Sequence, residues 1–263
     1  MRNTDVLRHR RGPLRLAVLV VFGLTVAAPS LGQGADSQPK PNPVTPQGCA
    51  RNVKGQPNLD LVNLLIAYHE CSGTVGCYTA DLEKVGKEAL DYLKQYLQNL
   101  RHATSAHPNE KMPAVVIDID ETALSNWDNM KETQFGDYDT QESLCWDSKA
   151  IAPAIKPVVN LFGFARKKKV ATIFLTGRCE SERAVTEKNL RTAGYRDWTK
   201  LIMRNKDECS PALSAEEYKS KERQTLEQDG YLIVLNIGDQ WSDLMGGYSL
   251  KTFKLPNPFY YIP

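Results

Sequence analysis

Hydrophobic positions in the first half of the chain repeat with the period of an α-helix. Between Pro57 and Ala103 they recur three or four residues apart, first over 59–66 and then over 82–100. This spacing gathers apolar side chains on one face of a helix, so it predicts two amphipathic helices. Two helices are therefore expected to precede the rest of the fold in the sequence.

After Pro113 the pattern changes to short apolar runs that alternate with helical stretches. Four continuous apolar runs are typical of strands buried on both faces, and they lie at 114–118, 170–175, 200–204 and 231–237. The helical stretches between them lie at 153–169, 181–193 and 214–228. This alternation predicts an α/β fold with a Rossmann-like parallel sheet covered by helices on both faces.

The first 48 residues have a different pattern. Residues 1–32 combine an Arg-rich start, the 13-residue apolar run Leu16–Ala28 and a stretch of small residues, as a cleaved signal peptide does. Residues 33–48 are rich in Pro, Gly and Gln and predict a disordered linker. A membrane span needs about 20 apolar residues, so the 13-residue run is too short to be one. We therefore expect export to the periplasm or the medium, without a stable membrane anchor.

The remainder, 49–263, is expected to form one domain. Apolar residues make up 41% of the chain and charged residues 24%, which is ordinary globular usage. The domain divides into three expected parts: a helical part at 49–110, a core at 111–263 and, within it, a lid insert at 123–152. The insert is rich in Trp, Asp, Glu and Gln.

The charge of the chain excludes one class of partner. Removal of residues 1–32 takes away five Arg and one Asp, which moves the formal charge from +2 to −2. A near-neutral protein without a long basic stripe lacks the electrostatic footprint for a nucleic acid polymer. A small-molecule partner is expected, and the oligomeric state is left open.

Six cysteines lie beyond the expected signal peptide, where export would let disulfides persist. Six cysteines allow 15 pairings. Cys71 and Cys77 enclose a short flexible loop that could close locally. Cys179 and Cys209 each follow a predicted strand, so their loops are expected to be adjacent. We predict these two bridges.

Polar groups follow the predicted strands where the strands end. Asp118 and Asp120 follow the first strand, Thr176 and Gly177 the second, and Asp239 and Asp243 the fourth. In a parallel sheet these ends meet at one edge, where ligands bind. Carboxylates beside a hydroxyl make a site for a hard cation. Lys219, on the helix before the fourth strand, could reach the same edge.

Each motif also has a simpler interpretation. An acidic turn can cap a helix, Thr176 can end a plain strand-to-helix turn, and Lys219 can lie on a solvated helix face. A calcium loop is excluded, because its sixth and twelfth positions would be Ala123 and Asn129, where Gly and Glu are required. The order of the motifs favours a shared site.

DIDET, TGR, the Lys-Ser of YKS and GDQWSD together resemble the four ordered motifs of the haloacid dehalogenase superfamily. The similarity is to its acid phosphatase branch, which includes bacterial class C acid phosphatases and plant vegetative storage proteins. The closing stretch FKLPNPFYYIP is also similar to the plant members. The resemblance is strong over about 111–263 and looser from about 50.

The resemblance implies a role for each motif residue. Asp118 would be the nucleophile and Asp120 the general acid and base, while Thr176 and Lys219 would hold the phosphate. The Gly177 N–H, at the same strand end as Thr176, is expected to bind the phosphate as well. A Mg²⁺ ion would be bound by Asp118, by Asp239 and by the backbone carbonyl of Asp120, with support from Asp243. Trp127, Trp146 and Trp241 are expected either to be buried or to stack on a leaving group.

These inferences lead to an exported, Mg²⁺-dependent acid phosphatase that hydrolyses small phosphomonoesters through an aspartyl-phosphate. Two alternatives stay open: a dedicated 5′-nucleotidase, and a storage or binding protein with the same fold and little turnover. A histidine acid phosphatase is excluded, because Arg101-His102 is not followed by the Gly and second Arg of its RHGxRxP signature.

Overall fold

The computed structural model describes residues 58–73, 75–102, 111–136, 140–205, 209 and 213–262. The chain divides into two units, 1–34 and 35–263, and everything described here belongs to the second. The expected signal peptide and linker lie outside the described residues. Among the described helices, none is both long and apolar enough to span a bilayer.

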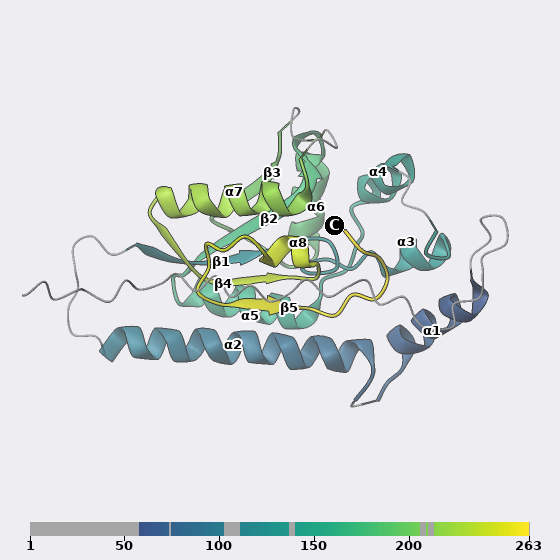
Figure 1. The fold of residues 1–263 in the computed structure, drawn as a ribbon, viewed down its shortest axis with the longest axis horizontal. Helices are drawn as coiled ribbons and strands as arrows, with labels where there is room; N and C mark the ends of the chain where they lie inside the picture. The colour runs from purple at the N-terminus through teal and green to yellow at the C-terminus, as the bar shows by residue number, and fades with distance from the viewer. Residues whose placement is uncertain are drawn as a thin grey trace, which may run out of the picture. The chain divides into compact units, whose positions relative to one another are not determined.

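A five-stranded parallel sheet forms the centre of this unit (Figure 1). Its strands are β1 Met112–Ile117, β2 Ala171–Cys179, β3 Lys200–Arg204, β4 Tyr231–Gly238 and β5 Thr252–Lys254. Their spatial order is β3-β2-β1-β4-β5, which places β1 in the middle. The predicted parallel sheet is confirmed. The three-residue β5 was not predicted, because it is too short for its pattern to stand out.

Buried apolar side chains on both faces of β1 explain its continuous apolar run. Val115 and Ile117 belong to one apolar cluster, whereas Ala114 and Val116 belong to another on the opposite face. All four are at most 1% exposed. Successive side chains of a strand point to opposite faces, so a strand buried on both faces must be apolar throughout.

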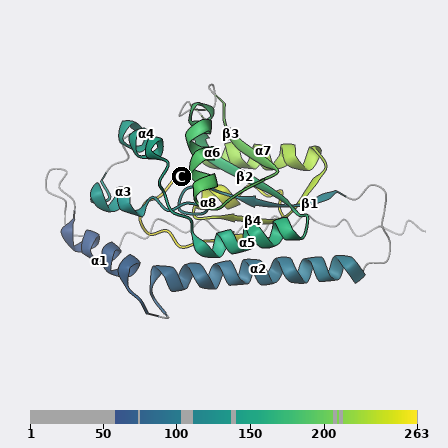
Figure 2. The same ribbon diagram turned by 180° about the vertical axis from the view of Figure 1, so that it is seen from behind.

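Helices cover the two faces of the sheet (Figures 1 and 2). The longer helices of this unit are α1 Leu59–Glu70, α2 Tyr78–His102, α5 Lys156–Lys167, α6 Arg183–Thr192 and α7 Ala215–Gln228. Of these, α2 and α5 lie against one face of the sheet and α7 lies against the other. The shorter ones are α3 Trp127–Glu132, α4 Thr140–Lys149, the 3₁₀ turn η1 Glu180–Glu182 and α8 Trp241–Leu244. The packing of α2 and α5 is close, because a Cβ on Gly86 would lie 2.3 Å from the Pro157 side chain.

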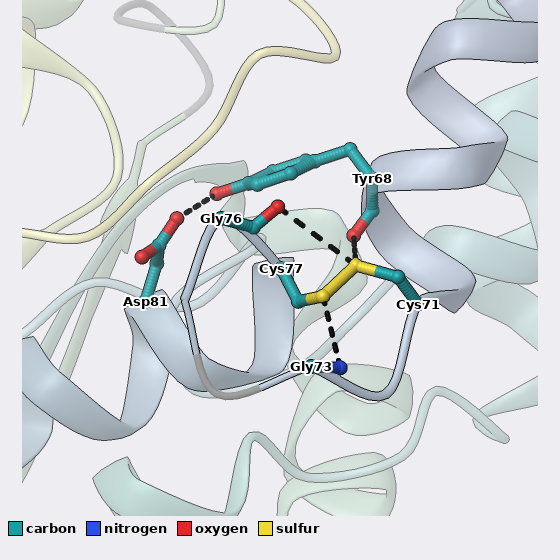
Figure 3. Close-up of a disulfide and its surroundings, with 6 residues drawn as sticks. All are labelled: Tyr68, Cys71, Gly73, Gly76, Cys77 and Asp81. Carbon is teal, nitrogen blue, oxygen red and sulfur yellow. Dashed lines mark hydrogen bonds between the residues drawn. A yellow bond between two sulfur atoms is a disulfide. The ribbon is translucent and has the colours of Figure 1, made fainter.

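The first predicted disulfide joins the end of α1 to the start of α2. Cys71 and Cys77 are bonded, and the Gly73 N–H donates to the Cys77 sulfur at 3.1 Å (Figure 3). Beside the bond, the Tyr68 hydroxyl donates to Asp81 at 2.8 Å, which adds a second tie between the two helices. The second predicted disulfide, between Cys179 and Cys209, is also present and joins the end of β2 to the loop after β3. Both pairings are confirmed.

The insert (residues 123–152) carries α3 and α4 and lies beyond the carboxyl ends of the strands (Figure 1). Its Trp127 stacks on His69 of α1 with a centroid distance of 3.5 Å. Phe259 packs against the same Trp127 ring at 5.3 Å. Through Trp127 the insert thereby packs against α1 and against the C-terminal tail, which we define as residues 255–262.

Candidate active site

Asp118 and Asp239 lie side by side because the strands that precede them are neighbours. β1 pairs with β4 in parallel, with Ile117 opposite Ile237. The Asp118 N–H continues this pairing by donating to the Ile237 carbonyl at 3.1 Å. Two carboxylates separated by more than 100 residues in sequence therefore reach the same edge of the sheet.

Asp243 completes a cluster of three buried carboxylates. The side chains of Asp118, Asp239 and Asp243 offer oxygen atoms that all lie within 4.8 Å of one another. Lys219 enters from α7, and its Nζ lies 2.5 Å from an oxygen of Asp118 and 2.5 Å from one of Asp243. The predicted convergence of these four residues is present in the structure.

A tight turn after β4 fixes Asp243. The backbone N–H of Gln240 donates to its carboxylate at 2.8 Å. A Cβ on Gly238 would lie 2.4 Å from the Asp243 Cβ, so only glycine fits there. The Asp243 carbonyl accepts from Arg223 at 2.6 Å and from Asn236 at 2.9 Å. The carboxylate is thus held by its turn and by a neighbouring strand and helix.

The capped start of α7 fixes the position of Lys219. Ser214 caps the start of α7 by accepting the Glu217 N–H at 3.1 Å, while the Glu217 carboxylate accepts the Ser214 N–H at 3.1 Å. This reciprocal capping fixes where the helix begins and therefore which side chain faces the sheet edge. Lys219 is 5% exposed, so it is not the solvated residue of the simpler interpretation.

The three-carboxylate cluster concentrates negative charge in a buried place. Burial raises the pKa of Asp239 to about 6, and the Asp243 charge adds to the shift. Burial and the Asp243 charge also raise the pKa of Asp118, although the Lys219 charge opposes them. Buried carboxylates that repel one another favour a cation between them. Oxygen donors in this arrangement fit a hard divalent cation such as Mg²⁺.

Asp120 has a different environment, although only one residue separates it from Asp118. Its carboxylate accepts from the Arg178 guanidinium at 2.7 Å and from the Asn126 side chain at 2.9 Å. Burial raises the pKa of Asp120, but the Arg178 charge and these hydrogen bonds outweigh it and lower the pKa overall. The Asp120 carboxylate is not one of the oxygens of the three-carboxylate cluster.

Arg178 connects Asp120 to the insert. The same guanidinium nitrogen that contacts Asp120 lies 2.8 Å from Asp147 of α4. Burial and the Asp120 charge raise the pKa of Asp147 to about 7, although the Arg178 charge opposes them. A second connection runs through Asn126, whose side-chain oxygen accepts from the Trp146 indole at 2.9 Å. The surroundings of Asp120 therefore depend on how the insert folds.

Thr176 and Gly177 lie at the end of β2, as expected. Thr176 is fully buried, and its hydroxyl oxygen accepts the Arg178 N–H at 3.1 Å, which leaves the hydroxyl proton for another acceptor. Gly177 is exposed, and a Cβ built on it would meet no atom within 4 Å. The space beside Gly177 is open to a ligand.

Several residues that surround the site were given no role by the sequence. Glu121 is buried at a φ of +51°, and burial with the Asp120 charge raises its pKa to about 8. Its carboxylate accepts from the Tyr260 hydroxyl at 3.1 Å. Arg178 is part of the TGR motif, and Asn126 follows the DIDET motif by four residues. These positions were the only signals in the sequence that pointed to Arg178 and Asn126. The insert tryptophans Trp127 and Trp146 are buried, as their structural interpretation expects.

Comparison with known proteins identifies the family. The family model of the HAD superfamily, subfamily IIIB (acid phosphatase), matches residues 62–263. The chain is 36% identical to acid phosphatase 1 of Solanum lycopersicum, over 70% of this chain and 69% of that protein. It is 37% identical to the stem 28 kDa glycoprotein of Glycine max, over 70% of each chain. It is 31% identical to vegetative storage protein 1 of Arabidopsis thaliana, over 71% of this chain and 66% of that protein.

The fold has a solved counterpart. The class C acid phosphatase from Bacillus anthracis with tungstate bound superposes with a TM-score of 0.58 at 23% identity, over 77% of this chain and 86% of that one. Such a likeness supports the fold, while the sequence matches support the family. The chain belongs to subfamily IIIB of the haloacid dehalogenase superfamily, the acid phosphatases.

Proposed function

We propose that this acid phosphatase is an exported, Mg²⁺-dependent phosphomonoesterase in which Asp118 attacks phosphorus and forms an aspartyl-phosphate. The observation that carries the proposal is the buried cluster of Asp118, Asp239 and Asp243 with Lys219 between two of its members. Phosphate monoesters are among the slowest substrates to hydrolyse unaided. A site for them needs a nucleophile, charge neutralisation and protonation of the leaving group, and each has a candidate here.

Asp118, Asp239 and the carbonyl of Asp120 would hold Mg²⁺, with Asp243 supporting from nearby. The ion would neutralise these carboxylates and the phosphate, so that one anion can approach another. Within the described part of the chain, Lys219 and Arg178 are the cations bonded to the carboxyl groups of the site, which leaves negative charge in excess. That excess supports a requirement for a divalent cation.

The reaction would proceed in two displacements. An oxygen of Asp118 attacks phosphorus in line and the ester oxygen departs, so that one hard step becomes two easier ones. Asp120 gives a proton to the departing oxygen and later takes one from the water that attacks the aspartyl-phosphate. Since Arg178 lowers the pKa of Asp120, the mechanism requires that this ion pair weakens before the ester bond breaks.

Thr176, Gly177 and Lys219 would bind the phosphate oxygens. Two N–H groups of the Lys219 ammonium donate to Asp118 and Asp243, and an ammonium has three. The third N–H, the Thr176 hydroxyl proton and the Gly177 N–H would therefore face the phosphate. Such fixed donors stabilise charge that develops in the transition state.

A storage role is the second candidate, because vegetative storage protein 1 is among the relatives. The nucleophile candidate Asp118 argues for turnover. The test is phosphate release by the mature protein from a nucleoside monophosphate, an aryl phosphate and a sugar phosphate, with Mg²⁺ and with EDTA. We expect Mg²⁺-dependent release, and a strong preference for the nucleotide would favour a 5′-nucleotidase. No release from any substrate would contradict the enzyme and favour storage.

Export is tested separately, by expressing the full chain and sequencing the N-terminus of the released protein. We expect loss of about the first 32 residues. Retention of the intact N-terminus inside the cell would contradict export.

A further inference from the structure

The C-terminal tail (residues 255–262) contacts Asp239 of the three-carboxylate cluster directly. The Asn257 side chain donates to one oxygen of Asp239 at 2.6 Å, and the Gln240 side chain donates to the same oxygen at 2.9 Å. The other oxygen accepts from the Thr122 hydroxyl at 3.1 Å. Asp239 is 1% exposed, so these three donors take the place of water around it.

The backbone of the tail fixes which way both amides point. The side-chain oxygen of Asn257 accepts the Phe259 N–H at 2.8 Å, and that of Gln240 accepts the Ile262 N–H at 3.2 Å. Because each amide oxygen already has a donor, each amide nitrogen must face Asp239. The tail therefore imposes the orientation of two amides that in turn orient one carboxylate.

The tail is itself held firmly, so it can act as a fixed support. Leu255 is fully buried and its N–H donates to the Gly238 carbonyl at 2.9 Å, next to Asp239. Phe259 is 8% exposed and packs against Tyr78 and Trp127, with ring centroids 5.1 and 5.3 Å away. Gln240 also donates its backbone N–H to Asp243, so it supports two carboxylates of the cluster.

We propose that Asn257 is a positioning residue for Asp239, supported by Gln240, and that the C-terminal tail supports the metal centre through Asn257. This inference rests on the proposed Mg²⁺ site. Hydrogen bonds to a carboxylate restrict its rotation, so these donors would fix the orientation in which Asp239 meets the ion. Removal of such a supporting partner lowers metal affinity by about 10–100-fold.

The test is calorimetric titration of Mg²⁺ into the full mature chain. The variants are Asn257→Ala, Gln240→Ala and Asp239→Asn. Tyr261→Ala is the matched control in the tail, because Tyr261 is 51% exposed. We expect wild type and Tyr261→Ala to bind equally, Asp239→Asn to lose binding, and Asn257→Ala to bind about 10-fold or more weakly. The Mg²⁺ needed for half-maximal turnover should rise in parallel, while kcat at saturating Mg²⁺ recovers toward wild type.

The outcomes separate this inference from the proposed function. If wild type binds no Mg²⁺, the metal site fails and the inference with it. If wild type binds Mg²⁺ but Asn257→Ala binds with an unchanged Kd, the inference alone is wrong. Circular dichroism in EDTA checks that each variant folds. If Asn257→Ala does not fold, the Kd of Gln240→Ala for Mg²⁺ decides in its place. If neither variant folds without metal, the tail is a structural element only and the inference is overturned.

Discussion

Asp118 and Asp120 leave the same strand, yet their carboxylates lie in regions of opposite electrostatic character. The proposed metal side of the site (Asp118, Asp239, Asp243 and Lys219) is buried and rich in carboxylates, and burial there raises the pKa of Asp118. The insert side (Asp120, Asn126, Arg178 and Asp147) is built around a guanidinium that lowers the pKa of Asp120. The side chain of Asp118 is 7% exposed and that of Asp120 is 32% exposed.

This difference shows how one turn can supply two chemical roles. Environments that push the pKa values of two carboxyl groups apart separate a nucleophile from an acid or base. Without metal, the order of the two pKa values is the reverse of the one that the mechanism needs, because Asp118, the nucleophile candidate, has the raised pKa. A divalent cation between the carboxylates would favour the ionised form of Asp118 and restore the order that the mechanism needs.

The largest effect is expected from Asp118→Asn. The amide cannot attack phosphorus, so kcat should fall by about 10⁴-fold or more. The substitution also removes one of three repelling buried carboxylates, so the free energy of unfolding in EDTA should be no lower than that of wild type. Steady-state kinetics and urea unfolding measure both. Wild-type turnover by this variant would exclude Asp118 as the nucleophile.

Asp120→Asn sharpens the comparison between the two sides. Loss of the general acid and base should lower kcat by about 10²–10⁴-fold. The Kd for Mg²⁺ should stay near the wild-type value, because the carboxylate lies outside the three-carboxylate cluster. Calorimetry beside kinetics makes the distinction. A large rise in the Kd would mean that the Asp120 carboxylate itself belongs to the metal side.

Gly238→Ala tests the packing of the metal side. The added Cβ would lie 2.4 Å from the Asp243 Cβ, so the turn must shift. We expect the free energy of unfolding to fall by about 1–3 kcal/mol and the Kd for Mg²⁺ to rise by about 10-fold. Gly177→Ala is the matched control for folding, since its Cβ would enter open space. Equal Mg²⁺ affinity in Gly238→Ala and wild type would show that Mg²⁺ binding does not depend on the close contact between Gly238 and Asp243.

Asp147→Asn tests the insert side through pH. Burial raises the pKa of Asp147 from 3.8 to about 7, so its contribution to stability is full below pH 3.8 and is lost as the pH rises toward 7. Between pH 4.5 and 7 the free energy of unfolding of wild type in EDTA should fall more than that of the variant, by on the order of 2 kcal/mol. Urea titrations at the two pH values measure this difference. Equal pH dependence would place Asp147 outside the buried network.

The metal side and Asp120 could be anticipated from the sequence, whereas the partners of Asp120 on the insert side and the contacts of the tail could not. Asp118 and Asp239 end long apolar runs, and parallel strands bring such ends to one edge whatever the loops do. Asp147 and Asn257 stand on short or irregular segments, and their partners depend on how those segments fold back. No periodic pattern marks such contacts. The Cys179–Cys209 pairing was predictable for the same reason as the carboxylates, since Cys179 ends β2 and Cys209 follows β3.

The central claim is that Asp118, and not water, attacks phosphorus. The most direct measurement is the stereochemical outcome of hydrolysis with a phosphomonoester made chiral at phosphorus by oxygen isotopes. Two in-line displacements each invert phosphorus, so the account predicts overall retention. Overall inversion would mean a single attack by water, and it would contradict the aspartyl-phosphate.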